Sequence, residues 1–298
     1  MLDRSRLMDQ ATIETIDDCR FTINSNLHPA GKTVGILTYI PFMDIHQGNP
    51  LAVPKDIDGR PYAKISGAWF SRYRNQYMEL VRVFPHYHHE DPFFGRSMAV
   101  PDEYVRRVTY ASPVPDHHPA LVGCSVLEIP RHVAGLVGSS TSGKCNAEDI
   151  DIGIIGRENA ASAMERLRIV LRNPENRVNH GYFDLPHPKQ FTARGRKFDL
   201  FYLYSMRDVR PLNAIPEVGD YVEVEDIVEN VEDAHFIPAV YRLESGKMLV
   251  SYQIEHTYFI NPGDRLIFHA HEIPQGYLIR QGDDWEDITA DRRLKFVL

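Results

Sequence analysis

The sequence predicts an α+β fold in which a mixed sheet near residues 115–210 is flanked by two β-rich segments. Runs of β-branched and aromatic residues, typical of strands, recur before residue 65 and after residue 220. The middle of the chain combines strand patterns with one clear amphipathic helix. After residue 211, turn residues separate short strands in a way that indicates a small barrel or sandwich. We therefore expect an N-terminal β-rich segment (1–114), a central domain (115–210) and a C-terminal β-rich domain (211–298).

Composition excludes several classes of protein. The 298 residues are 43% hydrophobic and 25% charged, which allows a core of ordinary size. A net charge of −8 disfavours a general nucleic-acid binder, because neutralising phosphates usually needs a basic face, although a local basic patch is compatible with it. Cys19, Cys124 and Cys145 form neither a disulfide framework nor a paired zinc motif. Without a bilayer-spanning apolar run or a signal-peptide core, we expect no membrane partner and a cytoplasmic location.

The N-terminal segment is expected to be mostly strands. Phe21–Ile23, Thr33–Ile40 and Tyr62–Ile65 carry the strand pattern, and Pro41 ends the second of them. A short helix is expected over Asp102–Val108, because Asp102 is a suitable N-cap residue.

Three histidines lie close together in this segment, in the run from His86 to Asp91. Histidines and carboxylates at short spacing can bind zinc. The run lies between two prolines and has no second ligand pair at a recognisable distance, so a solvated or substrate-edge loop is the favoured interpretation. Metal binding by the three histidines is the alternative. They are His86, His88 and His89.

The central domain alternates strands and helices. Ala120–Ile129 has the composition of a buried helix, and Val133–Val137 follows as a strand. A second, amphipathic helix is expected between Gly156 and Asn173, where an Asn-Pro pair ends it. The run Arg196–Tyr202 is again apolar and strand-like.

Two aspartates dominate the functional interpretation. The run Asp149-Ile-Asp151-Ile alternates as a strand does, so both carboxylates are expected on one face and Ile150 and Ile152 on the other. Adjacent carboxylates repel unless a cation neutralises them, and Mg²⁺ prefers such oxygen ligands. The alternative is an edge strand with solvated aspartates.

A P-loop is a competing interpretation of the preceding loop. Residues 138–144 match G-x-x-x-x-G-K, but Cys145 stands where the motif needs a hydroxyl for Mg²⁺. A P-loop also opens into a helix that binds phosphate at its N-terminus, and only Asn146-Ala147-Glu148 separate Cys145 from the strand. The P-loop is therefore disfavoured.

The motif resembles a known family. Gly138-Ser139, an Asp-x-Asp pair whose first aspartate lies ten positions after Ser139, and the later strand aspartate Asp199 resemble the signature of the DNA polymerase β-like nucleotidyltransferase superfamily. The flanking segments are more weakly similar to a predicted archaeal-type nucleotidyltransferase family, for example in Val222–Asp226 and Phe236–Tyr241.

The resemblance implies a palm domain and specific residue roles. Asp149, Asp151 and Asp199 would bind two Mg²⁺ ions, with Mn²⁺ as an alternative, and Asp199 would accept the proton of the attacking hydroxyl. The implied nucleotide-binding residues are Gly138, Ser139, Ser140 and Lys144. Further cations between the two halves of the motif either steady the triphosphate or lie in a solvated loop. They are Arg177, His180, Lys189 and Arg194.

The implied activity is Mg²⁺-dependent transfer of a nucleoside monophosphate from an NTP to a hydroxyl acceptor, with release of pyrophosphate. A small molecule or a protein hydroxyl fits the acidic balance best as acceptor. The alternatives are an RNA 3′-end nucleotidyltransferase, a catalytically inactive nucleotide-binding module and, last, a structural adaptor.

Overall fold

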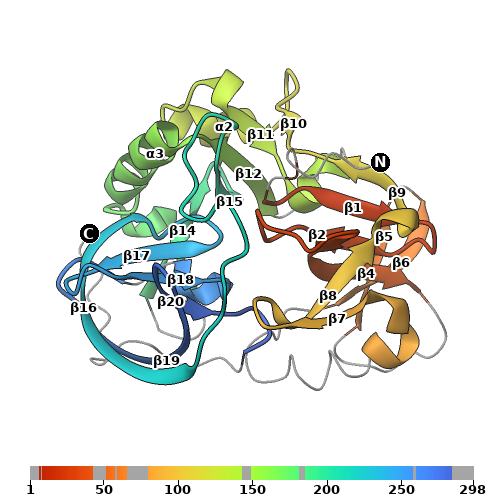
Figure 1. Ribbon diagram of the computed structural model, residues 1–298. Helices are drawn as coiled ribbons and strands as arrows, with labels where there is room; N and C mark the ends of the chain where they lie inside the picture. The colour runs from red at the N-terminus through yellow and green to blue at the C-terminus, as the bar shows by residue number, and fades with distance from the viewer. Residues whose placement is uncertain are drawn as a thin grey trace.

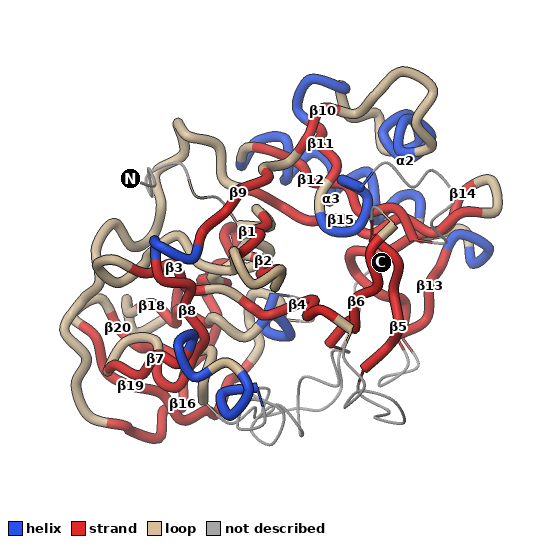
Figure 2. Tube along the Cα trace, turned by 90° about the vertical axis from the view of Figure 1, so that its right-hand side faces the viewer, coloured by secondary structure: helices blue, strands red, loops and turns tan. Residues whose placement is uncertain are grey.

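The computed structural model describes Leu7 and residues 9–42, 52–57, 59–65, 80–142, 149–180, 185–257 and 260–283. The predicted α+β class is wrong. Among the described residues, strands make up 46% against 18% for helices, and these strands form four sheets, one of them a closed five-stranded barrel. Figures 1 and 2 show the helices as short segments around these sheets. The sequence patterns overestimated the helical share, because short apolar runs do not by themselves distinguish a helix from a buried strand.

The N-terminal part of the chain forms a six-stranded sheet and a three-stranded sheet. One face of the larger sheet packs as a core around Ile13, Phe21 and Leu37. The helix expected over Asp102–Val108 is wrong, because only a 3-10 turn, η4 (Asp102–Tyr104), precedes a strand there. The larger sheet has the order β5 (Ala52–Ile57), β6 (Arg60–Ile65), β4 (Ile36–Pro41), β2 (Arg20–Thr22), β1 (Thr12–Thr15) and β9 (Val105–Thr109), and the smaller one has the order β3 (Lys32–Val34), β8 (Gly95–Pro101) and β7 (His88–Asp91).

The central sheet is mixed and has helices on one face. α3 (Arg157–Val170) confirms the expected amphipathic helix, and α2 (Ala120–Val126) is a shorter form of the helix expected at 120–129. Both helices share a hydrophobic core with Ile152 and Phe198 of the sheet. The strand order is β10 (Ser112–Pro113), β11 (Ala134–Leu136), β12 (Asp149–Ile155), β15 (Arg196–Leu203), β14 (Leu185–Ala193) and β13 (Arg177–His180).

The C-terminal strands close into a barrel, which confirms the expectation of a small barrel or sandwich there. Its interior holds Tyr241, Leu249 and Phe268, among others. None of the helices in the described ranges is long and apolar enough to cross a membrane. The barrel order is β16 (Tyr221–Asp233), β17 (Ala239–Leu243), β18 (Met248–Ser251), β20 (Gly276–Ile279) and β19 (Arg265–Ile273). The remaining short helical turns are η3 (Pro85–Tyr87), η5 (Arg131–Val133), η6 (Gly138–Ser142), η7 (Pro174–Asn176) and η8 (Ile254–Thr257).

A buried lysine ties the central sheet to the barrel segment. Lys189 on β14 donates hydrogen bonds to the carbonyl of His235 and to Oγ1 of Thr257, both at 2.9 Å. Burial lowers the pKa of Lys189 to about 7, against the opposing effect of Asp9. The same burial, together with the positive charges of Lys189 and Arg168, lowers the pKa of His235 to about 3.

The protein should therefore lose stability in mild acid through His235. Its folded-state pKa lies below the unfolded value near 6.5, so the unfolded chain takes up the proton first as the pH falls. The stability that depends on neutral His235 is therefore fully present above pH 6.5 and is lost progressively as the pH falls toward 3. Urea unfolding at pH 7.5 and 4.5 should show a fall in unfolding free energy that is about 2 kcal/mol smaller in His235→Gln than in the wild type. The exposed His132→Gln is the control, and equal pH dependence in all three proteins would contradict the prediction.

Candidate active site

Strand register brings the three predicted carboxylates together. β12 and β15 run parallel, with Asp151 paired to Asp199 and Asp149 paired to Lys197. Paired residues on neighbouring strands point to the same side of a sheet, so all three carboxylates share one face. Ile150 and Ile152 lie in the core with α2 and α3, on the opposite face, which confirms the expected alternation.

The turn η6 packs directly against Asp151. Gly138 has a φ of +53°, and a Cβ atom there would lie 2.7 Å from Oδ2 of Asp151. The backbone N–H of Asp151 donates to Oγ of Ser140 at 2.8 Å. Ser140 therefore holds the aspartate strand in place, a role that the sequence did not indicate. Ser139 lies in the same turn, whereas Lys144 lies outside the described residues.

The ammonium group of Lys197 lies close to two of the three carboxylates. Nζ of Lys197 lies 3.4 Å from Oδ1 of Asp149 and 3.9 Å from Oδ2 of Asp199. Burial raises the pKa of Asp199 to about 7; Lys197 opposes this rise, and the charges of Asp151 and Asp149 add to it. Lys197 lies two positions before Asp199 on β15, so the strand alternation that places Asp199 on this face places Lys197 there as well. The sequence pattern thus contained a signal for this lysine, although the motif does not include it.

The donor chemistry of this face fits a hard divalent cation. The ligands are carboxylate oxygens, as Mg²⁺ prefers, and Oδ1 of Asp199 is buried without a hydrogen-bond partner in the described part of the chain. The side chains are not gathered into a closed ligand set: among the residues described, no three His, Cys, Asp or Glu side chains converge closely enough to hold a metal. The Lys197 ammonium takes part of the neutralising role that a cation would have.

Two of the other predicted cations, Lys189 and Arg177, bind groups away from this face. Lys189 binds the barrel segment, as described above, and Arg177 donates to the carbonyl of Leu171 at 2.7 Å. Arg194 is exposed in the turn between β14 and β15. The side chain of His180 lies outside the described residues.

The three histidines contact separate carboxylates rather than one another. His86 lies 3.0 Å from Asp17 and stacks on Tyr104, and His89 lies 2.7 Å from Asp91. His88 is 3.9 Å from Glu90. Expected as part of a loop, His88 and His89 instead begin the strand β7. The described residues around them form no group of metal ligands.

Residues of the N-terminal sheet also approach the carboxylates. Burial raises the pKa of the Tyr39 hydroxyl, and the charge of Asp151 adds to this while Arg20 opposes it. Tyr39 on β4 therefore lies within electrostatic reach of Asp151 on one side and of Arg20, on β2, on the other. No local pattern in the sequence places these strands beside β12.

Comparison of the chain with protein-family models, with curated proteins and with solved structures yields no match.

Proposed function

We propose that the protein is a Mg²⁺-dependent nucleotidyltransferase that moves a nucleoside monophosphate from an NTP to a hydroxyl acceptor. The pairing of Asp151 with Asp199 on adjacent parallel strands, with Asp149 two residues away on the same face, carries this proposal. Three carboxylates on one face, next to the glycine of η6, match what the sequence motif requires.

The reaction balances without a further reactant. The acceptor hydroxyl oxygen forms a bond to the α-phosphorus, and the bond between that phosphorus and the oxygen leading to the β-phosphorus breaks. Pyrophosphate leaves, and the hydroxyl proton passes to a base or to water. Bound at Asp149, Asp151 and Asp199, Mg²⁺ would stabilise the attacking and leaving oxygens.

The chain's own residues supply positioning and proton transfer in this proposal. Gly138 leaves space beside Asp151, because any side chain there would meet the carboxylate. Ser140 fixes the backbone of Asp151. Asp199, whose Oδ1 is buried without a hydrogen-bond partner among the described residues, is the candidate to accept the hydroxyl proton.

A screen for pyrophosphate release tests the proposal. The protein is incubated with each of the four NTPs, a small-molecule fraction of a cell extract, and either Mg²⁺ or EDTA. Release is expected with at least one NTP, only with Mg²⁺ and only with the extract fraction, and mass spectrometry should then show an NMP adduct. No release under any combination would count against the activity.

The position of Lys197 favours a second candidate, a nucleotide-binding module without turnover. An ammonium group between Asp149 and Asp199 lowers the need for a metal at these two carboxylates. Titration calorimetry distinguishes the two functions, because the inactive module would bind an NTP without releasing pyrophosphate.

A further inference from the structure

A row of polar residues crosses the six-stranded N-terminal sheet at one register position. Each member is the direct partner of the next on the neighbouring strand, so all of them lie on the face opposite the Ile13, Phe21 and Leu37 core. We call this set the charged row. It consists of Lys64 on β6, Tyr39 on β4, Arg20 on β2, Glu14 on β1 and Arg107 on β9.

A β-bulge turns Tyr39 onto this face. The register shifts between Arg20 and Phe21, so Arg20 pairs with Tyr39 while Phe21 pairs with Leu37. Thr38 is the extra residue, and its hydroxyl meets that of Thr22 at 2.8 Å. Without the bulge, Tyr39 would share the core face with Leu37. Bulges are frequent next to active sites, where they redirect a side chain.

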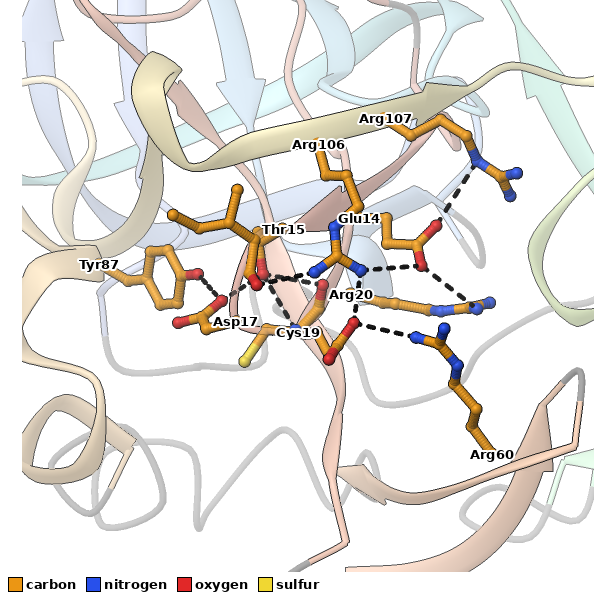
Figure 3. Close-up of polar contacts among 11 residues, drawn as sticks. Glu14, Thr15, Asp17, Cys19, Arg20, Arg60, Tyr87, Arg106 and Arg107 are labelled. Atoms are coloured by element: carbon orange, nitrogen blue, oxygen red, sulfur yellow. Dashed lines mark hydrogen bonds and ion pairs between the residues drawn. The ribbon is translucent and has the colours of Figure 1, made fainter.

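The row carries an excess of positive charge. Glu14 is its one carboxylate, and it lies 3.9 Å from Arg20 and 3.5 Å from Arg107. Arg106 approaches the same carboxylate at 3.9 Å, so several guanidinium groups surround it, as Figure 3 shows. Exposure rises along the row, since the Arg20 side chain is 13% exposed and that of Arg107 is 63% exposed. The half-buried end is therefore the stronger place to bind an anion.

A buried hydroxyl lies beside this inner end. Tyr62 on β6 is 1% exposed, and its hydroxyl has no hydrogen-bond partner within the described residues. The guanidinium of Arg20 lies over its ring at 5.0 Å, and the rings of Tyr39 and Tyr62 meet edge to face at 6.4 Å. A buried hydroxyl without a partner is costly unless a ligand or water satisfies it.

The inner end of the row lies toward the carboxylate face. Tyr39 lies within electrostatic reach of both Arg20 and Asp151. Figure 1 shows the sheet that holds β2 and β4 next to β12. A ligand held at Arg20 could thus place another of its groups near Asp151 and Asp199.

We propose that the charged row binds the acceptor, and that the acceptor is a small molecule carrying a phosphate or carboxylate group in addition to its hydroxyl. This inference rests on the nucleotidyltransferase activity proposed above. The guanidinium of Arg20 receives the anionic group, because its planar fork matches two oxygens of a phosphate or carboxylate. Tyr39 and Tyr62 offer hydroxyls at the inner end, and the acceptor hydroxyl points toward the carboxylates.

Ligand binding without NTP or metal tests the row separately from catalysis. Glycerol 3-phosphate, glycerate and glycerol share one skeleton and differ in charged group. Titration calorimetry of each, in EDTA, is expected to show binding of glycerol 3-phosphate, glycerate or both, and none of glycerol. The charged probe that binds identifies the anionic group of the acceptor.

Two charge-removing variants of the row are expected to change the Kd in opposite directions. Arg20→Gln should raise the Kd of the charged probe about tenfold, because it removes the receiving cation. Glu14→Gln should lower that Kd about threefold, because it removes the carboxylate that competes for the same guanidinium groups. Arg242→Gln, on an exposed barrel position, is the charge-matched control and should leave the Kd within about twofold.

The outcomes separate this inference from the proposed activity. If neither charged probe binds, or if neither row variant changes the Kd, the row is overturned as the acceptor site whatever the pyrophosphate screen shows. If a charged probe binds with a Kd that the row variants change, but no pyrophosphate is released in the screen, the anion site is upheld and only the transferase activity is contradicted. Once an acceptor is known, Arg20→Gln should raise its KM while leaving the KM for the NTP unchanged.

Discussion

Asp151→Asn is expected to slow pyrophosphate release about a thousandfold or more, while its melting temperature stays close to that of the wild type. Asp151 lies at the centre of the site, paired with Asp199 and in contact with Gly138. Asparagine keeps the shape of the side chain and the backbone hydrogen bond to Ser140, but it loses the charge needed to hold a cation. A coupled pyrophosphate assay at saturating NTP measures the effect.

A thermal-shift titration with Mg²⁺ adds a readout that does not depend on turnover. A ligand that binds the folded state raises the melting temperature, so the wild type should be stabilised by Mg²⁺ and Asp151→Asn should not be. Asp220→Asn, at an exposed position before the barrel, is the matched control and should behave as the wild type. Unimpaired turnover in Asp151→Asn would refute the proposed function.

The sequence indicated the local structure of this site better than its surroundings. Period-two alternation is a property of a single strand, so it was enough to place Asp149 and Asp151 on one face of β12. The pairing of Asp151 with Asp199 is a tertiary fact, because 48 positions and two further strands separate them along the chain. The motif resemblance suggested that the two aspartates lie close together, and the parallel register places them as direct partners on adjacent strands.

The fold class was misjudged because strand pairing is non-local. The sequence runs indicated β2, β4 and β6, but they showed neither β1, β5 and β9 nor that the six strands would join into one sheet. Asp102 suggested a helix start, yet the chain turns there only once before β9 pairs with β1. Tertiary pairing overrides a weak local preference of this kind.

The charged row illustrates the same limit at the level of function. Its five residues lie on five strands, so no spacing in the sequence connects them. The bulge that turns Tyr39 is likewise visible only in the register with β2. The alternation of β15 alone could have placed Lys197 beside Asp199, whereas no local pattern could have placed Arg20 in the charged row.

Gly138→Ala is expected to slow pyrophosphate release about a hundredfold, the second largest effect we expect. The methyl group would lie 2.7 Å from Oδ2 of Asp151, closer than a Cβ contact allows, so the carboxylate must move. A displacement of about 1 Å at a reacting group can cost about a hundredfold in rate. The positive φ of +53° adds backbone strain of about 1 kcal/mol, which should lower the melting temperature by a few degrees.

Gly195→Ala separates the strain from the contact. Gly195 has a φ of +72° in the turn before β15, and nothing lies within 4 Å of a Cβ added there. It should therefore show a similar loss of melting temperature with pyrophosphate release within about twofold of the wild type. Equal rates in the two alanine variants would mean that Asp151 tolerates displacement, and that the close approach of η6 to β12 serves folding rather than catalysis.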